Sequence, residues 1–397
     1  MPSAGKRGGR LAVGLISGTS LDGIDAALVR ISGQAGRPRV DLLAFHTFPY
    51  PARLRRQLLQ LAGGEAVSTA ALSEINFRLG ALFGRAVERL CRRQRVKLSS
   101  LHCIGSHGQT VFHQGRPSGG RKGPRHPAST LQLGEPSLIA ARCGVTTVAD
   151  FRPTDMGLGG QGAPLVPLVD YLLFAHARLG TVALNIGGIA NITVIPRGGR
   201  QEDVVGFDTG PGNMVIDALV RRHTRGKQNF DRNGRIASHG FVIPQVLKKC
   251  LSHSFLRLRP PKSAGREQFG ADFVGKILRA GASHRSQDLI ATATELTVVT
   301  IVEALKRFVL PRTPVDRLIV SGGGAHNRHL MRRLGEMLPG TRLQQSHEFG
   351  IPEDAKEAIA FALLAERTLK GLPGNLPAVT GATRPAILGK VIYASRY

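Results

Sequence analysis

The stretch VGLISGTSLDGIDAALVRI, residues 13–31, contains an apolar run that breaks off and then resumes. Between its two apolar parts lies a small, polar segment made of Gly18, Thr19, Ser20, Leu21, Asp22 and Gly23. A plain β-hairpin needs about two turn residues, such as Asn-Gly or Asp-Gly. This turn carries two hydroxyls, two glycines and a carboxylate, and a second carboxylate, Asp25, follows Ile24. The stretch therefore predicts two strands, 11–17 and 24–31, joined by a loop that holds a ligand.

The same pattern of elements occurs twice along the chain. The first copy is predicted as strands 11–17, 24–31 and 39–48, a helix over 68–96, a strand 101–106, a helix 135–142 and a strand 145–149. The second copy is predicted as strands 182–185, 189–195 and 204–208, a helix from about 212, a helix near 288–308, a strand 318–320 and a helix to about 338. A Gly-rich turn follows the first strand each time. We infer a duplicated α/β architecture, with a ligand in the cleft between its halves.

Length and composition favour two domains in the cytoplasm. The chain has 397 residues and is 42% hydrophobic, enough for more than one core. We expect a loose basic tail at 1–10, domain I at 11–140 with the segment 371–397 packing back on it, and domain II at 141–370. No apolar run approaches the roughly 18 residues that span a bilayer, and the N-terminus lacks a signal core, so we expect no membrane partner. The four cysteines form no Cys-x-x-Cys pair and are expected to be reduced.

The formal net charge of +27 raises the alternative of a nucleic-acid binder. The basic residues are dispersed, however, and the chain has no tryptophan and only four tyrosines on which bases could stack. The loop 114–129 is basic and rich in Gly and Pro, which predicts an exposed loop. We therefore expect only weak, nonspecific contact with nucleic acid.

Three Gly-rich turns follow predicted strands, at 18–23, 187–188 and 322–324. Exposed amides in such turns bind anions, and glycine lets the backbone approach a phosphate. Any one of these turns alone is weak evidence, because ordinary tight turns have the same composition. Three of them are stronger evidence, since two occupy equivalent places in the repeat and the third opens a helix. GLGGQG (157–162) follows no strand directly and lacks the acid of a dinucleotide site, and no Walker A motif occurs.

Asp208, in GFDTGPGNMVIDAL (206–219), is the leading catalytic candidate. It is predicted at the end of a strand, where a carboxylate suits a general base. The alternative is that it caps the following helix or closes an Asx-turn. Glu357, in KEAIAFALLAE, is a weaker candidate, because exposed helix glutamates are common. His107, in SHGQTVFH, could orient a substrate or be a structural histidine.

A set of ordered motifs carries a family resemblance. The segments are GLISGTSLDGID, SHGQTVFH, DFRPTDMGLGGQGAPLVP, LNIGGIANIT, GFDTGPGN, PPKSAGRE, VSGGGAHN and GLPGNLPAVTGA. In this order they resemble the anhydro-N-acetylmuramic acid kinases over almost the whole chain. The resemblance implies a duplicated actin-like sugar-kinase fold, ribonuclease H-like, with two domains and an interdomain cleft. It also implies an ATP- and Mg²⁺-dependent kinase that opens the 1,6-anhydro bridge and forms N-acetylmuramate 6-phosphate in cell-wall recycling.

The resemblance also implies which residues bind ATP, bind the substrate and carry catalysis. It implies no metal site made by protein side chains alone. It implies ATP contacts at Gly18, Thr19, Ser20, Leu21, Asp22, Gly23, Ile24, Asp25, Gly187, Gly188, Gly322, Gly323, Gly324 and Asn327. It implies Asp208 as the catalytic base and substrate contacts at His107, Arg152, Gln161 and Glu357. We also expect a homodimer. The chain departs from the family at Pro153 and Thr154, where relatives often continue a run of arginines. Which residues bind the substrate carboxylate therefore stays an open question at this point.

One further class of protein stays open at this point. Other members of the superfamily are nucleotide-binding modules that hydrolyse ATP to change shape and have no sugar kinase activity. Such a module needs no base on the sugar side, and the segment FDTGPGN argues against it.

Overall fold

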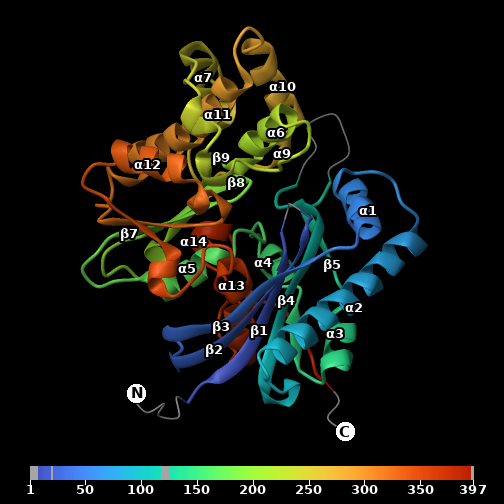
Figure 1. Cartoon of the computed structure of the whole chain (residues 1–397). Helices are drawn as coiled ribbons and strands as arrows, with labels where there is room; N and C mark the ends of the chain where they lie inside the picture. The colour runs from blue at the N-terminus through green and yellow to red at the C-terminus, as the bar shows by residue number, and fades with distance from the viewer. Residues whose placement is uncertain (1–7, 19–20, 118–125, 395–397) are drawn as a thin grey trace. The chain divides into compact units, whose positions relative to one another are not determined.

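The computed structural model describes residues 8–18, 21–117 and 126–394 of the chain (Figure 1). They form two compact units: unit 1 combines Met1–Leu173 with Ala355–Tyr397, and unit 2 is Phe174–Asp354. The boundaries thus differ from those expected at 140/141 and 370/371. The reason is that β6 (Thr147–Ala149) pairs with β4 (Leu101–Gln114), a strand of unit 1. Helix α13 (Lys356–Leu369) also packs against β4 and against β1 (Arg10–Ser17).

Unit 1 is built around a seven-stranded mixed sheet. Its other strands are β1 (Arg10–Ser17), β2 (Gly23–Gln34), β3 (Arg37–Pro49), β4 (Leu101–Gln114), β5 (Ser129–Leu133) and β12 (Lys390–Ile392). The order is β12-β6-β4-β1-β2-β3, and β5 pairs with β4 outside this path. β1 is antiparallel to β2, as is β2 to β3, whereas β4 is parallel to β1 and β6. Of the predicted tail 1–10, residues 1–7 lie outside the described part and Arg10 already begins β1.

Helices cover both faces of this sheet (Figure 1). The helices that pack against its strands are α1 (Ala52–Ala62), α2 (Thr69–Arg93), α3 (Pro136–Cys143), α4 (Arg152–Gly157) and α13. Further helices are α5 (Val166–Phe174) and α14 (Pro377–Thr380), and a 3₁₀ turn lies at Leu98–Ser100. Val13 and Leu15 pack into the core that α2 covers. Gly14, between them, faces α13, because a Cβ there would clash with the Ala358 carbonyl oxygen. Successive residues of a strand point to opposite faces, so β1 is buried on both sides.

Unit 2 repeats the strand order of unit 1. Its strands are β7 (Thr181–Ile186), β8 (Ile189–Ile195), β9 (Val205–Pro211), β10 (Arg317–Ser321) and β11 (Arg342–Gln345), in the order β11-β10-β7-β8-β9. β7, β8 and β9 are successively antiparallel, and β10 is parallel to both β7 and β11. The path β6-β4-β1-β2-β3 of unit 1 has the same directions, which confirms the predicted duplication.

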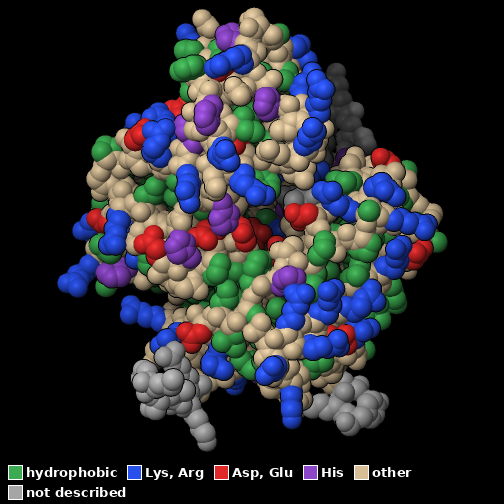
Figure 2. Space-filling view, in the orientation of Figure 1, with side chains coloured by type: hydrophobic (Ala, Val, Ile, Leu, Met, Phe, Trp, Pro, Cys, Tyr) green, Lys and Arg blue, Asp and Glu red, His purple; other side chains and the backbone are tan. Residues whose placement is uncertain are grey.

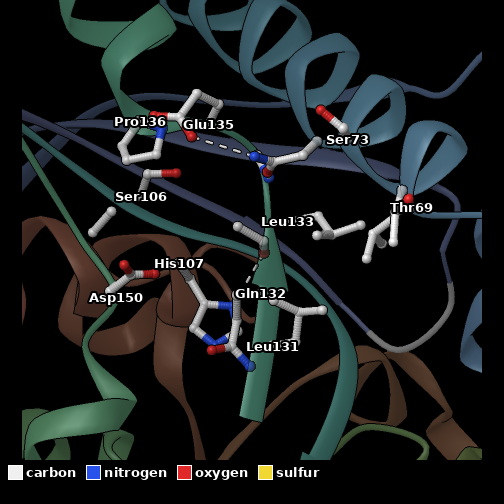
Figure 3. A pocket seen from close by; sticks show the side chains of 15 residues that line it. Thr69, Ser73, Ser106, His107, Leu131, Gln132, Leu133, Glu135, Pro136 and Asp150 are labelled. Carbon is white, nitrogen blue, oxygen red and sulfur yellow. Dashed lines mark hydrogen bonds between the residues drawn. The ribbon is translucent and has the colours of Figure 1, made fainter.

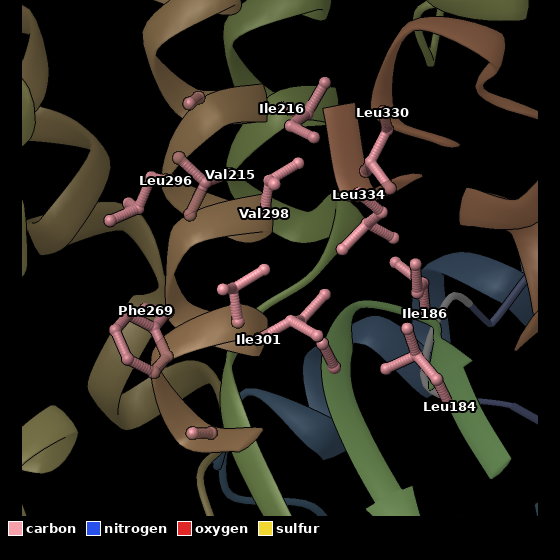
Figure 4. Packing of buried hydrophobic residues seen from close by; sticks show 14 of the residues in the cluster. Leu184, Ile186, Val215, Ile216, Phe269, Leu296, Val298, Ile301, Leu330 and Leu334 are labelled. Atoms are coloured by element: carbon pink, nitrogen blue, oxygen red, sulfur yellow. The ribbon is translucent and has the colours of Figure 1, made fainter. Parts of the chain in front are cut away.

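The core of unit 2 surrounds α11. The helices are α6 (Asn213–His223), α7 (Pro244–Leu251), α8 (Ser254–Arg257), α9 (Arg266–Phe269), α10 (Ala271–Ala280), α11 (Ser286–Ala304) and α12 (Arg328–Met337). A π-helical turn at Leu305–Val309 continues α11, and 3₁₀ turns occur at Gln201–Asp203, Arg232–Gly234, Ala237–His239, Gly323–His326 and Ser346–Phe349. Figure 4 shows Leu296, Val298 and Ile301 of α11 among side chains of α6. These contacts hold α6, and the turn before it, against the sheet.

The structure differs from the predicted elements where distant segments pair. β4 does not stop at Ser106 but runs to Gln114, and β5 lies beside it in a stretch that partly overlaps the predicted loop 114–129. Residues 118–125 of that loop lie outside the described part. Gly108, with a φ of 74°, lets β4 continue past an irregular point. Local sequence could not show this pairing, because the partner strand begins about fifteen residues further on.

Lys and Arg side chains are spread over many elements on the face shown in Figure 2. The dispersed distribution agrees with the sequence, where no long basic run occurs. A basic surface of this kind attracts anions in general and does not define one site.

Candidate active site

The loop between β1 and β2 holds the first group of predicted ATP contacts. The Leu21 backbone N–H donates to the Gly18 carbonyl oxygen at 3.3 Å, and Leu21 has a φ of 54°. Such a left-handed residue closes a tight turn. Arg55 of α1 braces the turn, with its Nε 2.9 Å from the Leu21 carbonyl oxygen. The predicted loop between two strands is confirmed, while Thr19 and Ser20 lie outside the described residues.

Two carboxylates flank this loop on its C-terminal side. Asp22 is exposed, and Asp25 lies in β2 beside Gly23 and Ile24, where its Oδ1 accepts a hydrogen bond from Thr47 Oγ1 at 2.5 Å. In the part of the chain that the structure describes, no group of three or more His, Cys, Asp or Glu side chains could hold a metal ion.

In unit 1, His107 of β4 is neutral and fixed in one tautomer. Its Nε2 accepts a hydrogen bond from Arg152 Nε at 3.0 Å, so the proton sits on Nδ1, 3.1 Å from the Gly108 carbonyl oxygen. The Phe361 ring packs on the imidazole, with 4.5 Å between ring centroids. Burial, with Arg152 beside it, holds the pKa of His107 well below its usual range. His107 therefore orients Arg152 and carries no charge.

Arg152, at the start of α4, donates a hydrogen bond to His107, and its charge acts on that of Glu357 in α13. Its Nη1 donates to the Gly162 carbonyl oxygen at 2.9 Å. Burial lowers the pKa of Arg152 to about 10, and the Glu357 charge opposes this shift. Burial raises the pKa of Glu357, and Lys356 and Arg152 oppose that rise. The arginine cluster (His107, Arg152 and Glu357) thus unites three of the four predicted substrate contacts within one unit.

Gln161, the fourth predicted contact, lies in a loop that Asp155 holds. The Gln161 N–H donates to the Thr380 carbonyl oxygen at 2.9 Å. Asp155 is fully buried, and its Oδ2 accepts from the Gly162 N–H at 2.8 Å while its Oδ1 accepts from Asn375 and Thr380 at 2.6 and 2.7 Å. Sequence reasoning missed Asp155, although it stands in the motif DFRPTD. These three hydrogen bonds of the Asp155 carboxylate hold the segment 157–162, whose Gly162 carbonyl oxygen contacts Arg152.

In unit 2, Asp208 lies inside β9 and not at the end of a strand. β9 continues through Pro211 because a register shift in β8 at Ala190/Asn191 allows the pairing to go on. Asp208 Oδ2 accepts from the Ala264 N–H at 2.7 Å, and the N-cap of α6 is Gly212, so Asp208 does not cap that helix. Burial raises the pKa of Asp208 to about 7, against the Ala264 N–H and Lys262. A carboxylate with this pKa suits proton transfer at neutral pH.

Lys262 is a site residue that the sequence reasoning did not single out, although it stands in the motif PPKSAGRE. Its backbone carbonyl oxygen accepts from the Asp208 N–H at 3.1 Å, and its Nζ lies 4.7 Å from the centre of the Phe255 ring. Burial and Arg307 lower the pKa of Lys262 to about 8, while Asp208 opposes the shift. The charges of Lys262 and Asp208 thus interact, and each favours the charged form of the other.

The two remaining glycine turns lie next to helix starts. The carbonyl oxygens of Gly187 and Gly188 accept from the N–H groups of residues 212–214 at the start of α6. Gly322 has a φ of 80°, and a Cβ there would come within 2.7 Å of the Asn185 side chain. Gly323 and Gly324 begin the 3₁₀ turn, and a Cβ on Gly324 would clash with Ile186. Positions 322 and 324 therefore need glycine, whereas a Cβ on Gly187 or Gly323 would meet only ordinary contacts. The nucleotide contacts of both turns stay a prediction.

Asn327 has a structural role that the sequence did not indicate. Its Oδ1 accepts from the Leu330 N–H at 3.0 Å and caps α12, and the side chain is buried. An N-cap of this kind stabilises the helix start. A nucleotide contact of Asn327 would have to come from another atom of the residue.

A pocket of about 370 Å³ opens in unit 1 beside His107 (Figure 3). It is bounded by the start of α2, by residues 106–108 of β4, by β5 with the turn into α3, and by Ala149 and Asp150 after β6. The volume suits a small molecule. His107 belongs both to the pocket wall and to the arginine cluster, whereas Arg152 and Glu357 do not line the pocket.

Strand order, duplication and glycine turns together define a protein of the actin-like, sugar-kinase class. The sequence profile of the family "Anhydro-N-acetylmuramic acid kinase" matches residues 10–394, and the chain belongs to that family. The anhydro-N-acetylmuramic acid kinase of Caldanaerobacter subterraneus subsp. tengcongensis is 42% identical over 384 residues, 96% of each protein. That of Bacillus cereus is 41% identical over 382 residues, 96% of this chain and 98% of the relative.

Among solved structures, the activator of the 2-hydroxyisocaproyl-CoA dehydratase from Clostridium difficile with bound ADPNP is similar over 91% of this chain and 96% of that one. The sequence identity is 11% and the TM-score is 0.45. A ROK family glucokinase from Streptomyces griseus, in complex with glucose and AMPPNP, has 12% identity and a TM-score of 0.34.

Among the helices of the described residues, none combines the length and the apolar character needed to cross a bilayer.

Proposed function

We propose that this chain is an ATP-dependent kinase that hydrolytically opens 1,6-anhydro-N-acetylmuramic acid and phosphorylates it to N-acetylmuramate 6-phosphate, in peptidoglycan recycling. The carrying observation is Asp208, a carboxylate whose pKa burial raises to about 7 and whose Oδ2 the Ala264 N–H holds at 2.7 Å. Family membership supports the same reaction.

The chemistry asks for a base because the acceptor oxygen is tied up in the anhydro bridge. A water attacks the anomeric carbon, the bond from that carbon to the bridging oxygen breaks, and this oxygen takes the γ-phosphoryl group of ATP. Asp208 takes the proton that the water loses, and ADP leaves. Lys262 beside Asp208 favours the carboxylate form, which keeps the base available near neutral pH. General bases of this kind contribute about 10²–10⁴-fold in rate.

The residues of unit 1 bind in this scheme and do not transfer protons. Arg152 keeps its positive charge and is oriented by His107 and by the Gly162 carbonyl oxygen, which fits a contact with the substrate carboxylate. Pro153 and Thr154 stand where relatives often have further arginines. Arg152 can bind the substrate carboxylate without them, because one guanidinium can donate two parallel hydrogen bonds to a carboxylate. Gln161 and Glu357 complete the substrate contacts.

ATP is the phosphoryl donor, with contacts from residues 18–25, 187–188, 322–324 and Asn327. Phosphoryl transfer relies mainly on positioning and on neutralising the phosphate charge. Mg²⁺ fits the oxygen donors of Asp22 and Asp25, because Mg²⁺ usually takes one or two carboxylates together with substrate phosphates. When bound, it would neutralise charge on the phosphates.

Three further properties concern the oligomeric state, the location in the cell and contact with nucleic acid. We propose a homodimer, action in the cytoplasm, and only weak contact with nucleic acid that salt abolishes. Light scattering and salt-dependent retention on DNA would test the first and last of these.

The deciding experiment is mass spectrometry of the product formed from Mg-ATP and the anhydro sugar in ¹⁸O-labelled water. We expect a product that has gained one phosphoryl group and one labelled oxygen at the anomeric position. A phosphorylated product with its bridge intact would refute hydrolytic opening, and ATP hydrolysis with unchanged sugar would refute the kinase.

A further inference from the structure

A lysine is buried at the start of α13. Lys356, the first residue of that helix, is 2% exposed, and its ammonium Nζ lies 2.9 Å from Oδ1 of Asp170 in α5. Asp170 is itself 3% exposed. Both residues belong to unit 1. The ion pair therefore joins two helices of that unit that are distant in the chain.

Helix stability does not explain a lysine at this position. The N-terminus of a helix carries a partial positive charge, so a cation in its first turn is unfavourable. The N-cap of α13, Ala355, has no side chain that could accept a hydrogen bond and offset this effect. Burying an ion pair also gains little stability, because desolvation of both charges offsets their attraction. The charge of Lys356 therefore points to a use beyond the packing of α13.

The neighbouring residue, Glu357, is the group on which this charge acts. Within residues 8–18, 21–117 and 126–394, the Glu357 carboxylate forms no hydrogen bond. Burial raises the pKa of Glu357, and the charge of Lys356 opposes this rise more strongly than that of Arg152 does. A carboxylate without a hydrogen-bond donor depends on nearby positive charges to stay ionised. Lys356 is the foremost of these charges for Glu357.

Asp170 fixes the ammonium without cancelling its effect on Glu357. The salt bridge of Lys356 goes to Asp170 in α5 and not to the adjacent glutamate. The charge of Asp170 raises the pKa of Glu357, but by less than Lys356 lowers it. Glu357 thus gains a positive neighbour and keeps its own oxygens available. A charged oxygen accepts a stronger hydrogen bond from a hydroxyl than a neutral one does.

We infer that Lys356 is a positioning residue for the sugar: held by Asp170, its ammonium keeps the Glu357 carboxylate charged and open to a hydroxyl of the substrate. The inference rests on the proposed function, in which Glu357 contacts the sugar. Lys356 acts only through Glu357 and takes no part in proton transfer. The arginine cluster is thereby extended inward by a buried ion pair that sets the charge of one of its members.

A double-mutant cycle separates this role from a purely structural one. Lys356→Met removes the ammonium and keeps much of the side-chain length, and Glu357→Gln removes the charge on which Lys356 acts. Lys370→Met is the matched control, because Lys370 follows the other end of α13 and its Nζ lies 2.8 Å from the buried carboxylate of Glu366. Calorimetry with 1,6-anhydro-N-acetylmuramic acid gives each Kd without ATP, kinetics give KM for sugar and ATP, and thermal unfolding gives Tm.

We expect Lys356→Met to weaken sugar binding about 10-fold, within the range of a hydrogen bond to a charged group. The KM for ATP should stay close to that of the wild type. In the Glu357→Gln background the same substitution should add less than about 2-fold, because no charge is left for it to act on. The Tm should fall in both backgrounds, because Asp170 loses the ammonium that pairs with it. Lys370→Met should leave the sugar affinity unchanged.

A second variant serves if Lys356→Met does not fold. Lys356→Met combined with Asp170→Asn removes both buried charges and should recover the Tm, since replacing a buried ion pair as a whole costs little. Sugar affinity should still be about 3-fold lower, because Lys356 affects Glu357 more than Asp170 opposes it. Adding Glu357→Gln to this variant completes the same cycle.

An equal loss of affinity with and without Glu357→Gln would show that Lys356 supports only the fold, and would overturn the inference. Wild-type affinity in a folded Lys356→Met protein, or in the double variant with Asp170→Asn, would overturn it too. The kinase proposal would survive both results. A wild-type protein that neither binds nor phosphorylates the anhydro sugar would refute the proposed function, and this inference with it.

Discussion

Asp208→Asn removes the proposed base and keeps its shape. The amide oxygen can still accept the Ala264 N–H, which lies 2.7 Å from Asp208 Oδ2, but the side chain cannot take a proton. We expect kcat for the anhydro sugar to fall by about 100- to 10,000-fold. ATP affinity should be largely kept, because the predicted nucleotide contacts are other residues.

The same substitution should stabilise the fold at alkaline pH. Burial raises the pKa of Asp208 from 3.8 to about 7, and at about 1.4 kcal/mol for each pKa unit this corresponds to about 4 kcal/mol. The side chain is partly exposed, so solvent screening reduces the expected effect to about 2 kcal/mol. Since the folded-state pKa is the higher one, the wild type has this stability below pH 3.8 and loses it as the pH rises to about 7. Asparagine does not titrate and escapes the loss.

Asp217→Asn is the matched control, because burial also raises the pKa of Asp217 in α6 to about 7 and no catalytic role is proposed for it. Both variants should gain stability over the wild type in urea unfolding at pH 8.5, and less at pH 5. Only Asp208→Asn should lose the rate, measured as ADP release that depends on the sugar. An Asp208→Asn enzyme that keeps more than about a tenth of the wild-type rate would refute the general-base assignment.

Three further changes test the surroundings. Lys262→Met should shift the acid limb of the kcat/KM profile to higher pH, because Lys262 lowers the pKa of Asp208; an unmoved limb would contradict their coupling. Arg152→Lys should raise KM for the sugar about 10-fold or more with a smaller change in kcat, as the fork that binds a carboxylate is lost; an unchanged KM would exclude that contact. Gly105→Ala should lower the unfolding free energy by about 3 kcal/mol in urea titration, because its Cβ would clash with a carbonyl oxygen of α13, whereas Gly157→Ala, which has open space, should cost nothing.

The repeat could be predicted from the sequence because each copy has strong local signals. Apolar runs broken by glycine turns, as at 18–23, mark strand ends whatever the rest of the chain does. The extension of β4 and the presence of β5 could not be predicted in this way, because they stabilise each other through pairing between separate segments. The boundary between the two units could not be predicted for the same reason, since α13 belongs to unit 1 only through its packing against β1 and β4.

The sequence predicted which residues belong to the candidate site, but not their pKa values or protonation states. Motifs identified Asp208, His107 and Arg152, yet the raised pKa of Asp208 comes from burial that no local pattern encodes. The tautomer of His107 likewise depends on Arg152, 45 residues away in the chain.

Unit 1 is made of two chain segments, with all of unit 2 between them. During synthesis strands β1 to β6 of unit 1 therefore leave the ribosome long before α13, the helix that covers β1 and β4 through the close contacts at Gly14 and Gly105. Unit 2 has all its residues available first and can complete its core first. Until residues 356–369 emerge, one face of the first sheet lacks its helix and exposes apolar surface. The nascent chain thus passes through a stage in which unit 1, although synthesised first, is less completely folded than unit 2. Chaperone binding to ribosome-bound chains should be strongest at this stage and should end once α13 is released.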